Sequence, residues 1–177
     1  MKTGLRSICQ NRILTAASAI GFVALSTISL HAATDTANMN VQLVIQAGCE
    51  FGTVNDLDFG TATTPLTANI DASTTMEVVC TNGTTYEVGL NAGTTAGGTV
   101  TTRKMFNAGT TEDVDYQLFQ DAAYTTNWGN DTAGGSDTVS GTGTGVTQTL
   151  TVHGRVPSQT TPTPATYTDV ITVTVEY

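Results

Sequence analysis

The sequence predicts an all-β domain, in the form of a sandwich or barrel. Thr and Gly are abundant, whereas charged residues make up only 12% of the chain. Short runs that alternate between apolar and polar residues recur, Pro and Gly clusters separate them, and no window shows a sustained helical period. Roughly seven short strands result, a number that suits a sandwich of the immunoglobulin type.

The first residues, 1–33, are typical of a secretory signal peptide. A basic start is followed by an apolar stretch over 13–30 and by small residues, so we expect cleavage near Ala32 or Ala33. The basic residues are Lys2, Arg6 and Arg12. A membrane-spanning helix needs about 20 strongly apolar residues. Because hydroxyl residues such as Thr15 and Ser18 dilute this stretch, a cleaved leader is favoured over a membrane anchor.

Removal of the leader leaves a strongly acidic mature chain. Three basic residues then stand against fifteen acidic ones, a formal charge of −12. A chain with so few cations cannot neutralise phosphates, which disfavours nucleic acid and anionic lipid as partners. About 144 residues remain, a length that fits one domain and one core.

Cysteine usage agrees with export. Cys9 lies in the leader, and the mature chain keeps Cys49 and Cys80. Disulfides persist in oxidising compartments, so a Cys49–Cys80 bridge is favoured over free thiols. A metal site would need more ligands than two thiols and the distant His153.

The first predicted strand spans residues 39–46. Its apolar face carries Met39, Val41, Leu43 and Ile45, and its other face is polar except for Val44. It has no neighbouring hairpin partner. The residues alone favour an ordinary first strand of the sandwich, since most alternating strands pair within their own sheet; the other reading is a strand that pairs with another molecule.

Two strands, 74–81 and 84–90, are predicted to pair as a hairpin. An Asn82-Gly83 dipeptide separates them, and Asn-Gly is a strong signal for a tight hairpin turn. Alternation places one set of side chains on the inner faces of the two strands. These are Met76, Val78 and Cys80, and then Tyr86, Val88 and Leu90.

Three further strands are predicted after these. Residues 114–119 place Val114, Tyr116 and Leu118 on one face, and residues 145–154 do the same for Val146, Leu150 and Val152. After several prolines the chain ends in the alternating run 167–177. Its core face is predicted to carry Ile171, Val173, Val175 and Tyr177.

Candidate chemistry is sparse, so we expect no enzyme activity and no cofactor. His153 is the one mature histidine, and no Gly-x-Ser-x-Gly elbow occurs. Two carboxylate pairs could in principle form acid-base or calcium sites, but acidic pairs in such a chain are more typical of solvated loops. The pairs are Asp56 with Asp58 and Asp113 with Asp115. Tyr124 and Trp128 could stack on a sugar, although packing within the domain is favoured.

Three segments resemble the spore coat protein U domain family, which includes subunits of archaic, Csu-type chaperone-usher pili. The strongest is Tyr116-Gln-Leu-Phe-Gln-Asp-Ala-Ala-Tyr-Thr-Thr-Asn-Trp-Gly129, which is similar to the family's run ending in Trp-Gly. The others are Leu150-Thr-Val-His-Gly-Arg-Val-Pro157 and the run 167–175. The chain departs from the family pattern at Ala165, where Gly is common, and at His153, where an aromatic residue is common.

The resemblance implies an incomplete immunoglobulin-like sandwich of the pilin type, completed by donor-strand exchange. Residues 34–46 would then be the donor strand and 47–177 the pilin domain. Met39, Val41, Leu43 and Ile45 would enter the groove of a neighbour, whose terminal strand offers Ile171, Val173, Val175 and Tyr177. The groove itself would first be filled by a periplasmic chaperone.

The implied partners are that chaperone, an outer-membrane usher, and identical or homologous pilin subunits, with export through the periplasm to the cell surface. The product would be a fibre for adhesion and biofilm formation, with this chain as a shaft or adaptor subunit because the mature length leaves no room for a receptor-binding domain. The alternative is a soluble secreted or coat-associated β-sandwich that does not polymerise.

Overall fold

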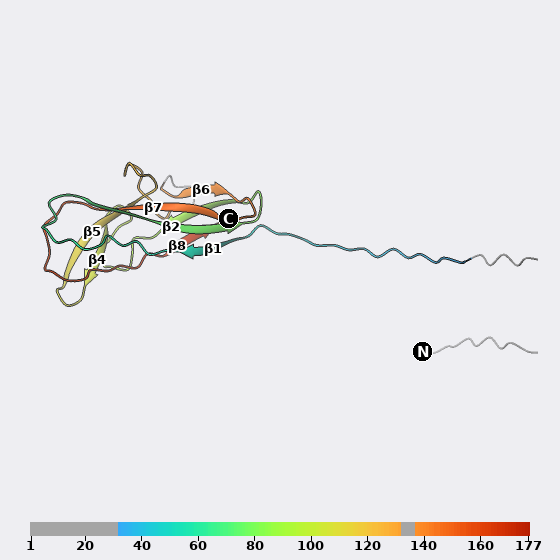
Figure 1. Ribbon diagram of the computed structural model, residues 1–177, viewed down its shortest axis with the longest axis horizontal. Coiled ribbons are helices and arrows are strands. Elements are labelled where there is room, and N and C mark those ends of the chain that lie inside the picture. Colours follow the sequence, from blue (N-terminus) through green and yellow to red (C-terminus); the bar gives the residue numbers. More distant parts are fainter. Residues whose placement is uncertain (1–31, 132–136) are drawn as a thin grey trace, which may run out of the picture. The chain divides into compact units, whose positions relative to one another are not determined.

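The computed structural model describes residues 32–131 and 137–177 (Figure 1). All regular secondary structure in these residues is β-strand. They are β1 (Cys49–Val54), β2 (Ile70–Cys80), β3 (Thr85–Leu90), β4 (Arg103–Asn107), β5 (Glu112–Phe119), β6 (Val139–Thr142), β7 (Gln148–Val156) and β8 (Val173–Glu176). Apart from Ala32 and Ala33, the predicted signal peptide lies outside the described residues. Among those described, no helix has the length and apolar character to cross a membrane.

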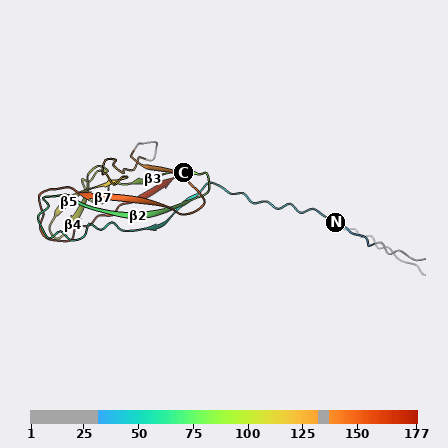
Figure 2. The same ribbon diagram turned by 45° about the horizontal axis from the view of Figure 1, so that its top comes forward.

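The strands form two antiparallel sheets, which confirms the all-β prediction. One sheet has the order β1-β2-β7-β5-β4 and the other the order β6-β3-β8. Figure 2 shows β3 in a layer separate from β2 and β7. The longest ladder joins β2 to β7, and runs from Ile70 opposite Val156 to Val78 opposite Gln148.

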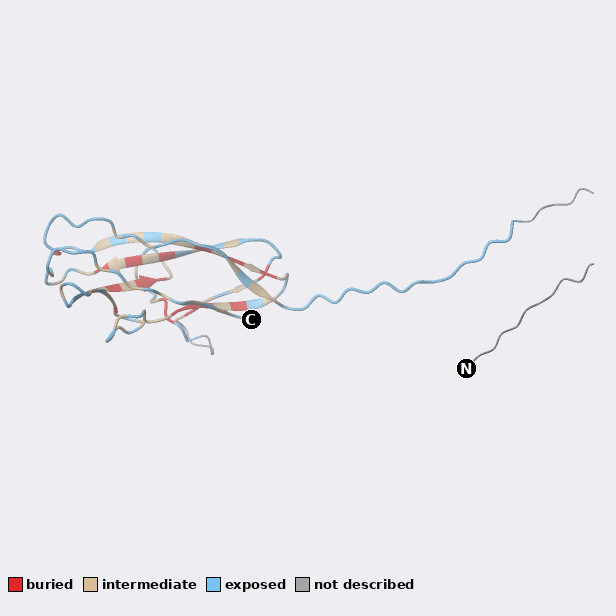
Figure 3. Cartoon of the chain, turned by 90° about the horizontal axis from the view of Figure 1, so that it is seen from below, coloured by how far each residue is buried: buried red, intermediate tan, exposed pale blue. Residues whose placement is uncertain are grey.

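Side chains from both sheets meet in one core. The predicted inner faces of β2, β3 and β5 are all buried, which confirms the alternation expected from the sequence. Figure 3 shows buried residues recurring along these strands between more exposed ones. A fully buried aliphatic or aromatic side chain contributes about 1.5 to 3 kcal/mol to folding, so these faces account for much of the stability.

The predicted hairpin is wrong, although its turn is right. Gly83 has the positive φ that the turn requires, 83°, and Thr84 donates its N–H to the Thr81 carbonyl. Beyond the turn the chain crosses to the other sheet, because Gly143 hydrogen-bonds to the backbone of both Gly83 and Thr84. β3 therefore pairs with β6 and β8, and β2 with β1 and β7.

Two other strands begin later than expected. Val146 is 64% exposed, contrary to the prediction that it shares the face of Leu150 and Val152. It follows Gly145, whose φ of 77° turns the chain before β7 begins. In the last run only Val173–Glu176 forms a strand, and a single bridge between Thr168 and Phe106 precedes it.

A buried arginine and a buried tryptophan hold the two sheets together on one side. Trp128 is fully buried, and its Nε1 donates a hydrogen bond to the Val88 carbonyl over 2.8 Å. Arg103 is also fully buried, and its guanidinium donates four hydrogen bonds of 2.7 Å. The acceptors are the carbonyls of Leu90, Asn91, Val100 and Trp128. Burial lowers the pKa of Arg103 to about 10, so the group stays charged at neutral pH.

The Cys49–Cys80 disulfide is present, as predicted. The two residues face each other at the start of the β1–β2 ladder, and their Cα atoms are 4.1 Å apart. The preceding residue is held as well, since Thr81 N–H donates to the Gly48 carbonyl and Gly48 N–H to Thr81 Oγ1. A bridge that closes a loop of this length stabilises a fold by about 3 to 4 kcal/mol in the chain-entropy account.

Candidate functional site: an open apolar groove

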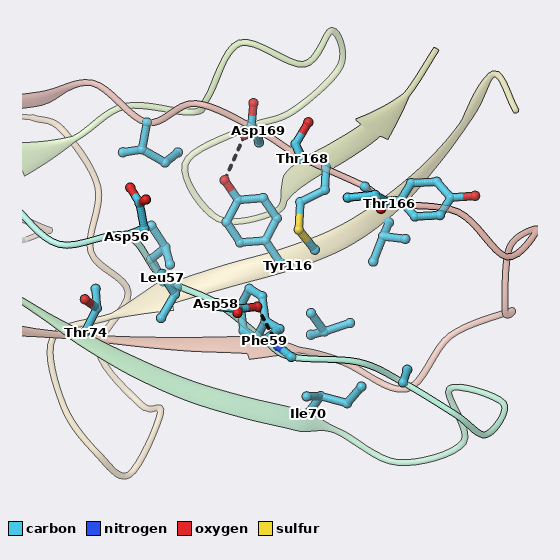
Figure 4. Close-up of a pocket in the computed structure, with 18 of the residues that line it drawn as sticks. Asp56, Leu57, Asp58, Phe59, Ile70, Thr74, Tyr116, Thr166, Thr168 and Asp169 are labelled. Atoms are coloured by element: carbon cyan, nitrogen blue, oxygen red, sulfur yellow. Dashed lines mark hydrogen bonds between the residues drawn. The ribbon is translucent and has the colours of Figure 1, made fainter. Parts of the chain in front are cut away.

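An apolar groove of about 1070 Å³ opens between two segments that are not strands (Figure 4). One wall is residues 55–64, which follow β1, and the other is residues 161–172, which lead into β8. The floor is made of core side chains from both sheets. It includes Met76, Leu90, Val114, Leu118, Val152 and Val156.

The first wall forms because the chain leaves β2 after Asn55. Asn55 makes the last hydrogen bonds to β2, since its N–H and side-chain amide both donate to the Thr75 carbonyl and its own carbonyl accepts from Thr74 Oγ1. From Ile70 to Thr74, β2 pairs with β7 along one edge, and along the other edge no described strand pairs with it. Apolar floor side chains are thus left beside backbone that lacks a strand partner.

Leu57 and Phe59 of this wall pack against the core, while Asp56 and Asp58 are exposed. Phe59 meets Tyr116 edge to face, with ring centroids 6.1 Å apart (Figure 4). Both apolar side chains lie over Gly154, where an added Cβ would be 2.5 Å from Leu57 Cδ2. This close approach explains the glycine in the 150–157 motif.

The second wall is held by side chains instead of a ladder. Tyr116 Oη donates to Asp169 Oδ2 over 2.8 Å, as Figure 4 shows. Asp169 Oδ1 accepts the backbone N–H groups of Thr94 and Thr95 at 2.9 and 3.1 Å. Three residues further on, Thr172 exchanges hydrogen bonds with Asn91. The wall is therefore ordered while most of its backbone is outside any sheet.

These contacts shift the pKa values of both partners. Burial raises the pKa of Tyr116 far above its usual range, and the hydrogen bond to Asp169 adds to this rise. Burial also works to raise the pKa of Asp169, but hydrogen bonds from Tyr116, Thr94 and Val170 outweigh it and lower the pKa. At neutral pH the pair is therefore a neutral phenol that donates to an ionised carboxylate.

β1 and β8 approach each other, and the groove is lined in part by Val54 of β1 and Val173 of β8. The two strands lie close in space (Figure 1), but among the described residues no ladder joins them. β8 pairs with β3 on one edge and leaves its other edge toward β1. An edge without a partner offers a row of backbone donors and acceptors to an added strand.

The predicted acceptor residues lie in three places. Ile171 and Val173 line the groove. Val175 packs against the core but is not part of the groove lining, and Tyr177 is exposed in a small depression beside Tyr86 and Thr142.

The predicted donor residues are among the most exposed apolar side chains. The exposed fractions are 84% for Met39, 83% for Val41, 81% for Leu43 and 77% for Ile45. Residues 32–48 form no strand, so the run 39–46 is not a strand of either sheet. Such an exposed apolar run normally marks a surface that another molecule covers.

The other chemical candidates have structural roles. Asp113 and Asp115 both bind the Lys104 ammonium, at 3.1 and 2.8 Å. Trp128 is buried too deeply to stack on a sugar. Tyr124 packs against Phe119 and lies 3.8 Å below the Arg155 guanidinium. Within 32–131 and 137–177, no three metal-ligating side chains gather.

Sequence reasoning missed Asp169, Arg103 and the wall residues Leu57 and Phe59. A signal for Asp169 existed, because it lies in phase with Ile171 and Val173 on the face of the last run that points inward. A carboxylate in that phase indicates a buried polar partner. The partner, Tyr116, is distant in sequence and could not be read from the alternation.

Comparisons with known proteins agree with this geometry. The Spore Coat Protein U domain family matches residues 35–174. Protein U of Myxococcus xanthus is 30% identical over 183 residues, which cover 94% of this chain and 99% of that protein.

A solved structure is also similar. It is the pre-assembly complex of CsuC and CsuE, a chaperone and a tip adhesion subunit, from the archaic chaperone-usher Csu pili of Acinetobacter baumannii. The TM-score is 0.51 and the identity 25%, and the match covers 75% of this chain but only 40% of that one. The chain thus belongs to the Spore Coat Protein U domain family, whose members are structural proteins and not enzymes.

Proposed function

We propose that this protein is a structural pilus subunit that polymerises by donor-strand complementation. Residues 34–46 are the donor segment, 47–177 the pilin domain and 1–33 the cleaved leader. The observation that carries the proposal is a match within one chain. An apolar groove lies between two walls without strand pairing, and the same chain carries four exposed apolar side chains in strict alternation.

Strand addition accounts for both features. Backbone hydrogen bonds from an added strand would satisfy the groove walls, and alternate side chains would fill the groove. Each donor side chain contributes about 1.5 to 3 kcal/mol if fully buried, so four contribute roughly 6 to 12 kcal/mol before the cost of ordering. A slip of one residue would present Asn40 and Gln42 instead, so the alternation also fixes the register.

The same groove defines the partners. An open apolar groove invites aggregation, so an exported subunit needs a periplasmic chaperone that covers it until an outer-membrane usher adds the next subunit. The similarity to a solved chaperone and subunit complex supports this assignment. The fibre would lie at the cell surface and serve adhesion and biofilm formation.

Deletion of residues 33–46 tests the proposal. The truncated domain keeps all eight described strands and should still be secreted, but it should form no SDS-resistant ladder. Leu43→Asp should have the same effect, since it places a charge in an apolar groove. The matched control is Gln42→Asp, which adds the same charge on the opposite face and should polymerise. Normal ladders from the truncated domain or from Leu43→Asp contradict the proposal.

A coat-associated protein that does not polymerise is the second candidate. It is favoured by the match to Protein U over 99% of that protein's length. Electron microscopy of purified surface material separates the two, because only the first candidate produces thin fibres that contain this protein.

A further inference from the structure

We propose that Asn82 is a latent deamidation site, which contact with Gly143 keeps closed in the folded chain and which opens when that contact is lost. Asn82-Gly83 is the single Asn-Gly pair in the sequence. Asparagine deamidates most readily before glycine, because glycine has no side chain to shield its backbone nitrogen. The site concerns the lifetime of the chain, so it is independent of the proposed function.

Deamidation at this pair needs no enzyme, metal or oxidant. The Gly83 backbone nitrogen loses its proton and attacks the side-chain Cγ of Asn82, and ammonia leaves. The product is a cyclic succinimide, which water opens at either carbonyl to give aspartate or isoaspartate. The nitrogen must be deprotonated to attack, because the lone pair of a neutral amide is delocalised into its carbonyl.

The side chain of Asn82 is free to react. It is exposed, and within residues 32–131 and 137–177 no hydrogen bond holds its amide. Two other asparagines that precede a small residue differ in this respect. The side-chain oxygens of Asn91 and Asn107 accept the N–H groups of Gly93 and Gly109, at 3.0 and 2.8 Å. Protection of Asn82 must therefore come from the nitrogen that would attack it.

That nitrogen is engaged. Gly83 N–H donates to the carbonyl of the buried Gly143 over 2.9 Å. Thr84 N–H closes the turn by donating to the Thr81 carbonyl over 3.1 Å, and Gly143 N–H donates to the Thr84 carbonyl over 2.7 Å. Ring closure would rotate the peptide between Asn82 and Gly83 and break the bond to Gly143. The proton that the reaction must remove is therefore held while this part of the fold is closed.

The contact depends on close packing where the chain crosses from one sheet to the other. A Cβ added at Gly143 would overlap the Thr81 carbonyl oxygen and lie 2.6 Å from Cys80 Cβ. Gly145 fastens the same segment, since its N–H donates to the Cys80 carbonyl over 3.0 Å. Cys80 is itself fixed by the disulfide. Local opening of this crossing would release Gly83 and expose the reactive pair together.

Isoaspartate at position 82 would make the opening permanent. It routes the main chain through the side-chain Cβ and so adds a backbone atom to the turn. The bonds from Gly143 to Gly83 and to Thr84 could then not both form. A chain that closes promptly is thus preserved, whereas a chain that remains open at the crossing is withdrawn from the folded population.

Peptide mass spectrometry of the mature chain, incubated at mildly alkaline pH, tests the site. Asn82 should deamidate at least about tenfold more slowly in the folded chain than in the same chain unfolded in urea. Gly143→Ala should accelerate deamidation, and Gly48→Ala, whose Cβ meets no atom within 4 Å, is the matched control. Hydrogen exchange of the Gly83 amide in the wild type provides a measurement that does not require Gly143→Ala to fold, and this amide should be protected.

Refolding tests the consequence. The isoaspartate form, prepared by incubating the unfolded chain, should fail to regain the folded state. Asn82→Asp carries the same charge with a normal main chain, and it should refold as the wild type does. Any of three results overturns the inference. They are deamidation as fast in the folded as in the unfolded wild type, a Gly83 amide without protection, and an isoaspartate form that refolds as well as Asn82→Asp.

Discussion

The two sides of the sandwich satisfy their backbone in opposite ways. On the closed side, around Arg103 and Trp128, carbonyls at the ends of strands and loops are bonded by buried side chains. On the groove side, residues 55–64 and 161–172 wall a core of similar apolar character but belong to no strand. The chain therefore supplies the backbone partners around this core on one side, whereas on the other side the two walls have no strand partner. Hydrophobic burial alone does not complete a sheet, because backbone groups also need partners.

The largest effect is expected on the closed side, for Arg103→Met. The change removes the donor of four carbonyls, two of them buried and two partly buried, which should cost about 3 to 5 kcal/mol of unfolding free energy. Urea unfolding followed by the fluorescence of Trp128, the single tryptophan, measures it. The control is Lys104→Met, which removes partly exposed ion pairs and should cost under about 1 kcal/mol. Equal losses in the two variants would show that burial of the cation is unimportant.

Removal of the disulfide should come next. The double variant Cys49→Ala and Cys80→Ala is expected to lose about 3 kcal/mol, measured in the same urea titration. Because the bridge ties β1 to β2, protection from amide exchange should fall first in β1. An unchanged urea midpoint would mean that the β1–β2 ladder is sufficient without the bridge.

On the groove side, Gly154→Ala tests the packing of the first wall. Its Cβ would lie 2.5 Å from Leu57 and 2.9 Å from Phe59, so these side chains must move, at about 1 to 3 kcal/mol. Binding of a peptide with the sequence of residues 38–46 should weaken at the same time. Gly48→Ala is the control, since no atom lies within 4 Å of its Cβ. Unaltered stability and peptide binding in Gly154→Ala would show that Leu57 and Phe59 can move aside without a cost in free energy.

The smallest effect is expected for Tyr116→Phe, at about 1 kcal/mol from one lost hydrogen bond. The folded-state pKa of Asp169 lies below the unfolded value, so its contribution is present above about pH 4 and is lost as the pH falls further. Tyr116→Phe should therefore flatten the acid limb of the stability curve, and Asp169→Asn should flatten it more. Acid limbs parallel to that of the wild type in both variants would contradict this role.

The sequence predicts which face of a strand is buried better than it predicts which strands pair. Alternation located the buried residues of β2, β3 and β5 correctly, because a side chain's face depends on its immediate neighbours. The Asn82-Gly83 turn was also correct, but the pairing across it was wrong, since Gly143, distant in sequence, bonds to the backbone of Gly83 and Thr84 and β3 then pairs in the other sheet. Arg103 was missed for a similar reason. Its four acceptors come from separate loops and strand ends, and no local pattern brings them together.

The disulfide also determines how a pulled fibre would carry load. Under the proposed function, tension on a subunit's tail enters at Gly48, and the Cys49–Cys80 bond passes it to β2, a central strand with a partner on each edge. β1 then bears little of the force that would otherwise peel it away one residue pair at a time. Single-molecule stretching after reduction should add an early, low-force rupture. Since β1 leads into the first wall, a subunit stretched from its tail would keep its groove intact and would continue to bind the donor segment of its neighbour.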